Sequence, residues 1–82
     1  MPSRQQWEQY GDNPLPELPD PAIRESLRKQ MGLTIEQAAR KCGVTRLTYR
    51  QWERGIWEPR PGKHREYAAL LDVWKKAIST LG

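Results

Sequence analysis

The sequence has few of the residues that build disulfides, metal centres and catalytic sites. Its 82 residues include one cysteine, Cys42, and one histidine, His64. One cysteine excludes an intramolecular disulfide, one Cys with one His disfavours a zinc site, and such cysteine usage suits the cytoplasm. We also find no paired carboxylates at catalytic spacing, no Ser/His/Asp set and no phosphate-binding glycine loop. We therefore predict no catalytic residue, no metal and no cofactor or small-molecule ligand.

Long apolar runs are also missing. A membrane-spanning helix needs about 18 or more consecutive apolar residues, and neither such a run nor a signal-peptide core is present. We predict a cytoplasmic protein with no membrane contact. Phenylalanine is absent, so four tryptophans and three tyrosines must supply much of the core. A chain of this length is near the lower limit for a self-sufficient core, which favours a single domain and a homodimer.

Positive charge is concentrated in one part of the chain. Residues 40–65 hold eight Lys and Arg against two Glu, or +6, whereas the whole chain carries +4. Residues 1–19 hold one Arg against three acids, or −2. An ordinary solvated face is one explanation of the basic block. Nucleic-acid binding is the other, and we favour it because the block coincides with the motif described next.

Residues 33–55 contain two helix patterns joined by a short turn. Thr34 is a good N-cap with Gln37 three residues later, as a capping box requires. Gly43 is suited to the left-handed conformation that ends a helix, and Thr45 then begins a second helix. Cys42 lies on the first helix, where we expect a small buried side chain.

The second helix has two distinct faces. Val44 and Tyr49 are placed to form a hydrophobic staple, and Tyr49 shares one face with Trp52, three residues later. The opposite face is basic and polar. A short helix with such a face, anchored by two aromatic residues, is suited to a DNA major groove. The residues of this outer face are Arg46, Leu47, Arg50 and Gln51.

The stretch resembles the helix-turn-helix of the phage-repressor family, of the Cro-like or XRE class. The matching segments are Leu33–Thr34, Gln37–Ala39, Gly43–Thr45 and Trp52–Gly55, with Pro59 shortly beyond. The resemblance extends more loosely over residues 21–78 and does not cover residues 1–19. It implies an all-α fold, a compact lambda-repressor-like bundle of four to five helices containing a helix-turn-helix, within a domain of residues 20–82.

The resemblance also implies roles for individual residues. An arginine at the position of Arg28 pairs in the family with the glutamate of the WERG-type motif, here Glu53. The family's usual phosphate-binding glutamine is replaced by Ile35, so another group near the first helix must make that contact. For bases, arginine suits guanine, glutamine suits adenine and leucine suits the thymine methyl. We expect base contacts from Arg46, Leu47, Arg50 and Gln51, and phosphate contacts from Thr34, Thr48, Arg60 and Lys63.

The segments before and after this motif also show recognisable patterns. Residues 1–19 form a proline-containing arm with Trp7 and Tyr10, which either packs on the domain, contacts a partner or stays unattached. Asp20–Pro21 is a strong helix start, after which Ile23, Leu27 and Met31 form an apolar stripe. For Trp57, in the loop of residues 55–63, we favour burial over exposure at a partner surface.

A long amphipathic helix is expected over residues 64–79. Its wide apolar face indicates either a dimer contact or simple coverage of a small core. The face comprises Tyr67, Ala68, Ala69, Leu70, Leu71, Val73, Trp74 and Ile78.

The sequence therefore predicts a sequence-specific transcriptional regulator that binds double-stranded DNA as a dimer, most simply a Cro-like repressor. A protein-interaction module, such as the antitoxin of a toxin–antitoxin pair, is the main alternative. An RNA-binding role comes third, because it needs exposed aromatic residues for base stacking.

Overall fold

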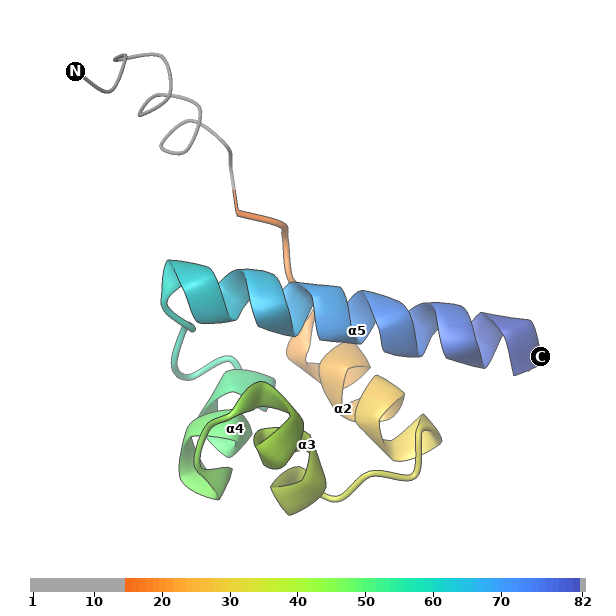
Figure 1. Ribbon diagram of the computed structural model, residues 1–82, viewed down its shortest axis with the longest axis horizontal. Helices are drawn as coiled ribbons and strands as arrows, with labels where there is room; N and C mark the ends of the chain where they lie inside the picture. The colour runs from red at the N-terminus through yellow and green to blue at the C-terminus, as the bar shows by residue number, and fades with distance from the viewer. Residues whose placement is uncertain (1–14, 82) are drawn as a thin grey trace, which may run out of the picture.

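The computed structural model describes residues 15–81, with side chains up to residue 80. Four α-helices lie in this part of the chain, and it contains no β-strand: α2 (Pro21–Gln30), α3 (Ile35–Cys42), α4 (Arg46–Glu53) and α5 (Pro61–Leu81). The long α5 runs across one side of a layer formed by the three shorter helices (Figure 1). The predicted all-α helical domain is confirmed. Most of the predicted arm, residues 1–14, lies outside the described residues.

The predicted starts of the first three helices are present. Thr34 Oγ1 accepts a hydrogen bond from the Gln37 amide at 3.1 Å, and Gln37 Oε1 accepts one from the Thr34 amide at 2.9 Å, which completes the capping box. Thr45 caps α4 by accepting from the Thr48 amide at 3.2 Å. Asp20 precedes Pro21 at the start of α2, although its side chain makes no capping hydrogen bond.

Two glycines shape the ends of the motif. Gly43 ends α3 with φ +67°, and Gly55 follows α4 with φ +74°, in the left-handed region that side chains disfavour. A Cβ at Gly55 would also lie 2.9 Å from Cγ of Pro21. Gly55 is therefore required both by its backbone conformation and by the close approach of α2 to the end of α4.

The core is small and aromatic. Tyr49 and Tyr67 pack edge to face with ring centroids 5.5 Å apart, and Trp52 lies 5.4 Å from Tyr67. Cys42 is buried as predicted, and this burial raises the pKa of its thiol to about 11. The thiol is consequently protonated and unreactive at neutral pH. The buried apolar residues are Leu27, Ala38, Ala39, Cys42, Tyr49, Trp52, Tyr67, Leu71 and Trp74.

Three expectations need correction. The predicted burial of Trp57 is wrong, because its side chain is 45% exposed and Pro59 is the buried residue of the loop. Ile23 is 49% exposed, so the apolar stripe of α2 buries Leu27 but not its first member. The last helix begins at Pro61 rather than residue 64, since proline is well suited to the first helical position.

The apolar face of α5 is used mainly inside the protein. Tyr67, Leu71 and Trp74 are buried, and Leu70 and Ile78 pack partly against the same core. Among the side chains of α5 up to residue 80, Val73 is the large apolar one that stays exposed, at 58%. Most of the wide apolar face predicted for this helix therefore covers the protein's own core. None of the helices in residues 15–81 has the length and apolar character needed to cross a membrane.

Candidate nucleic-acid interface

The candidate interface is the unit formed by α3, the turn at Gly43 and α4. The two helices pack directly on each other below α5 (Figure 1). Small residues make this possible, because Ala38 and Ala39 are almost fully buried and let a neighbouring helix approach closely. Ile35 is half-buried and packs against the core. The residue that replaces the family's glutamine therefore has a packing role here.

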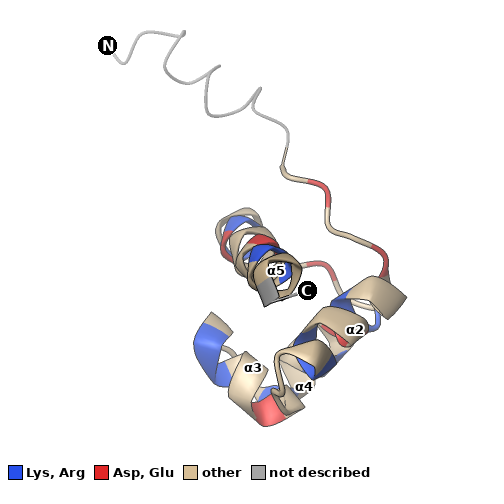
Figure 2. Cartoon of the chain, turned by 90° about the vertical axis from the view of Figure 1, so that its right-hand side faces the viewer, with Lys and Arg blue, Asp and Glu red and all other residues tan. Residues whose placement is uncertain are grey.

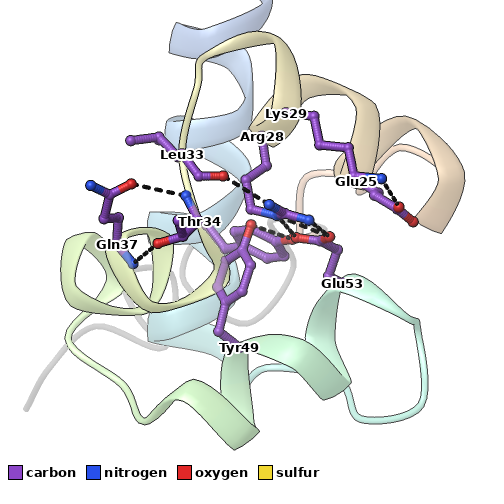
Figure 3. Close-up of polar contacts among 9 residues, drawn as sticks. Glu25, Arg28, Lys29, Leu33, Thr34, Gln37, Tyr49 and Glu53 are labelled. Atoms are coloured by element: carbon purple, nitrogen blue, oxygen red, sulfur yellow. Dashed lines mark hydrogen bonds and ion pairs between the residues drawn. The ribbon is translucent and has the colours of Figure 1, made fainter.

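The inner face of α4 carries a hydrogen bond between two buried tyrosine hydroxyl groups. The Tyr67 hydroxyl donates to that of Tyr49 at 3.5 Å. The Tyr49 side chain also points toward the Glu53 carboxylate (Figure 3). Burial raises the pKa of Tyr67 to about 12, and it raises the pKa of Tyr49 even further. Both phenols therefore remain neutral hydrogen-bonding groups at physiological pH.

A buried ion pair fixes the same face to α2. Arg28 Nε donates to Glu53 Oε2 at 2.8 Å and Nη2 donates to Oε1 at 3.0 Å, while Nη1 donates to the Leu33 carbonyl at 2.8 Å (Figure 3). The side chains of Arg28 and Glu53 are 10% and 5% exposed. The hydrogen bond with Glu53 raises the pKa of Arg28. No buried side-chain polar atom among the described residues lacks a hydrogen-bond partner.

The outer face of α4 is open to solvent. Arg46 and Arg50 are exposed, Leu47 is 59% exposed, and Gln51 is half-buried. Neither arginine forms an ion pair with another residue of the described chain. This face therefore combines unpaired guanidinium groups, an amide and an apolar side chain on a rigidly held helix. These are the groups that recognise base edges in a major groove.

The four residues predicted to contact phosphate lie in different surroundings. Thr34 and Thr48 are at the N-terminal ends of α3 and α4, and the Thr48 hydroxyl accepts a hydrogen bond from Thr45 at 2.9 Å. Arg60 is exposed at the start of α5, with no ion pair in residues 15–80. Lys63 is different, because its ammonium group donates to the Cys42 carbonyl at 2.9 Å and lies 3.1 Å from Glu66.

Two further residues connect the motif to its surroundings, and sequence patterns did not single them out. Arg24 donates through Nη1 to the Trp52 carbonyl at the end of α4 and through Nε to the Pro19 carbonyl, both at 2.6 Å. His64 Nε2 lies 2.6 Å from the Pro16 carbonyl oxygen. These contacts have no sequence signal, because all three partners are backbone carbonyls, and those of Trp52 and Pro16 lie 28 and 48 residues away along the chain.

The charged positions are unevenly distributed. Basic positions occur on all four helices, whereas the described stretch before α2 carries only acidic ones, Glu17 and Asp20 (Figure 2). Many of the basic groups on α2 and α3 are neutralised by neighbours. Lys29 pairs with Glu25 at 2.6 Å, and Arg40 pairs with Glu36 at 3.1 Å. The outer face of α4 and the loop after it therefore carry unpaired positive charge, as do Lys41 on α3 and Lys75 on α5.

Comparison with known protein families agrees with this geometry. The family model described as helix-turn-helix matches residues 25–73, which is more than half of the chain and includes α3, α4 and most of α5. No curated protein and no solved structure gives a significant match.

Proposed function

Because the chain belongs to the helix-turn-helix family of DNA-binding domains, we propose that it is a sequence-specific transcriptional repressor that binds its operator as a dimer. The family binds DNA and is not enzymatic, so DNA is a partner of this protein. The observation that supports specific recognition is the contrast between the two faces of α4. Its inner face is fully hydrogen-bonded, while its outer face presents Arg46, Leu47 and Arg50 without partners.

Docking on the duplex comes first in the proposed mechanism. Phosphate contacts from hydroxyl groups, helix N-terminal amides and exposed cations set the register of a protein on DNA without carrying sequence information. We assign this role to Thr34, Thr48, Arg60 and Lys63. Because Ile35 cannot donate a side-chain hydrogen bond, the N-terminal amides of α3 and the Thr34 hydroxyl take over the contact usually made by glutamine at that position.

Base contacts then provide specificity. A guanidinium group can donate two hydrogen bonds to O6 and N7 of guanine, and a side-chain amide can pair with N6 and N7 of adenine. We assign guanine contacts to Arg46 and Arg50, an adenine contact to Gln51 and a thymine methyl contact to Leu47. Arg28 and Glu53 do not contact bases in this scheme, and their ion pair holds α4 in the orientation that presents its outer face.

Selection of bound sequences from random duplex DNA tests this proposal directly. We expect enrichment of a site with two-fold symmetry whose half-sites contain guanine. Repeating the selection with Arg50→Ala should relax the preference at one base pair of each half-site. Recovery of no preferred sequence by the wild-type protein would contradict the proposal and leave a nonspecific DNA-binding protein or an interaction module.

A further inference from the structure

Two large apolar side chains are exposed next to each other directly after α4. Ile56 is 57% exposed and Trp57 is 45% exposed. Trp57 also lines an open hollow of about 300 Å³ together with Leu15, which is 38% exposed. Adjacent exposed residues of this size are unusual in a small domain, whose described part has nine buried apolar residues, and they mark a contact surface.

This surface is rigidly attached to the end of α4. The carbonyl oxygen of Gln51 accepts hydrogen bonds from the Ile56 amide at 2.9 Å and from the Trp57 amide at 3.3 Å. The amide of Gly55 donates to the Trp52 carbonyl at 3.0 Å, so the turn has the two hydrogen bonds of a Schellman motif. A partner bound here is consequently held at a fixed position relative to α4.

The charges around the two apolar residues are self-complementary. Glu58 lies between Arg54 and Arg60 in the sequence, and all three side chains are exposed. None of them forms an ion pair within the described part of the chain. Across a two-fold axis, the acid of one copy can face a base of the other, because the same patch meets itself.

We propose that Ile56, Trp57 and Glu58, here called the loop patch, form the surface through which two copies of the protein pair on DNA. The proposal rests on the proposed function, since it identifies the contact that joins the two operator-bound copies. Pairing through this patch brings the C-terminal ends of the two α4 helices together near the axis. Their outer faces can then enter successive major grooves, which lie about 34 Å apart on one side of the duplex.

The small area of the patch determines how strong this pairing is. A stable protein–protein interface buries roughly 800 Å² on each partner, and two half-exposed side chains with one neighbour provide much less. Pairing is therefore weak in free solution. It becomes effective on DNA, where two adjacent half-sites raise the effective concentration of one copy near the other.

The exposed surface of α5 is a less suitable dimer contact. Val73 is an exposed large apolar residue of this helix, and the shallow surface around it is bordered by Arg40, Lys41 and Lys63. Arg40 and Lys63 are already paired with acids of the same chain. Lys41 is the remaining cation of that surface, and where two copies meet no unpaired acid among the lining residues can offset its charge.

The chain offers a matched pair of variants to test the loop patch. Ile56→Ala and Val73→Ala truncate apolar side chains of nearly equal exposure, 57% and 58%. Binding is measured on duplexes that carry either one or two copies of the selected half-site. Cooperativity is the gain in affinity per copy on the duplex with two half-sites relative to the duplex with one. We expect Ile56→Ala and Trp57→Ala to lower cooperativity by about tenfold and to leave single half-site binding unchanged. Val73→Ala should change neither.

A charge reversal and an association measurement complete the test. Glu58→Arg should also reduce cooperativity, because the facing patches then carry only positive charge. Loss of cooperativity in Val73→Ala but not in Ile56→Ala would overturn the assignment to the loop patch. Sedimentation showing one wild-type copy on the two-half-site duplex would overturn pairing itself. Failure of the wild-type protein to prefer the half-site would instead count against the proposed function.

Discussion

The two faces of α4 differ in every property that matters for recognition. Tyr49, Trp52 and Glu53 on the inner face are at most 5% exposed, and the polar groups among them are hydrogen-bonded. Arg46, Leu47 and Arg50 on the outer face are exposed and have no polar partner within the described chain. A helix eight residues long is too short to be stable alone. Packing of the inner face therefore keeps α4 helical, and this holds the side chains of the outer face in a fixed arrangement.

The same contrast divides the basic residues of the protein. The charges of Arg28 and Lys63 are engaged by Glu53 and Glu66, and Arg24 is bound to two backbone carbonyls. Arg50 and Arg60 have no such partners in the described residues. A charge count alone therefore overestimates what is available to DNA, and the pairing of each side chain decides its role.

The largest effect is expected for Arg28→Ala. Removing the guanidinium group leaves the Glu53 carboxylate buried without its partner, which should lower the free energy of unfolding by about 3 kcal/mol or more. Thermal or urea unfolding measures this loss. Since Tyr49 and Glu53 are buried together on the inner face of α4, we expect the same variant to disturb the packing of this helix.

Lys29→Ala is the matched control for that variant. Lys29 lies next to Arg28 and pairs with Glu25 at 2.6 Å, but its side chain is 62% exposed. Exposed pairs of this kind contribute little to stability, so the melting temperature should barely change. Equal melting temperatures for Arg28→Ala and the wild-type protein would show that the buried pair has no more effect than a surface pair.

High pH should also affect the inner face more than the outer face. The pKa of Tyr67 rises from about 10 to about 12 on folding because of burial, so the folded state favours the protonated phenol. Its stabilising contribution is complete below pH 10 and is lost as the pH rises towards 12, at a cost of about 3 kcal/mol. Unfolding measured between pH 8 and 12 should show this decline, and Tyr67→Phe should reduce it.

Cys42 contributes to the same alkaline decline. Burial raises its pKa to about 11, so its contribution begins to fall near pH 9, and Cys42→Ala should remove that first part of the decline. Stability that stays constant from pH 9 to 11 would contradict the assignment of buried, neutral side chains at these positions.

Local chemistry made much of this architecture predictable. The two capping threonines, the turn at Gly43 and the spacing of Tyr49 and Trp52 each indicate a structure through neighbours within four residues. The pairing of Arg28 with Glu53 could be expected only from the resemblance, because 25 residues separate the two.

The exposure of Trp57 was not predictable in the same way. An indole in a loop can be buried or exposed with the same neighbours in sequence, and in this loop Pro59 is buried while Trp57 is exposed. The contacts of Arg24 and Lys63 with backbone carbonyls have the same origin. They depend on how α2 and α5 are placed against the ends of α4 and α3, and sequence periodicity contains no such information.

The outer face of α4 can be tested by comparing arginines of equal charge. Replacing Arg46 or Arg50 by alanine should cost about 1–3 kcal/mol on operator DNA and relax preference at one base pair. Replacing Arg60 should weaken binding to operator and scrambled DNA alike, because phosphate is common to both. Titrations on both duplexes make the comparison. Equal losses for all three variants on both duplexes would show that α4 does not contact bases specifically.

The smallest effect separates the two predicted phosphate contacts outside the motif helices. Each phosphate neutralised by a free cation adds about 0.9 to the slope of log affinity against log salt concentration. Arg60 is unpaired, so Arg60→Ala should reduce that slope by about one unit and leave stability unchanged. The Lys63 ammonium is bound to the Cys42 carbonyl at 2.9 Å and to Glu66. Lys63→Ala should therefore reduce the slope by less than one unit and cost about 1 kcal/mol of stability, because a hydrogen bond to the end of α3 is lost. If Lys63→Ala instead reduced the slope of the salt dependence by a full unit and left stability unchanged, the Lys63 side chain would have to leave its internal partners when DNA binds.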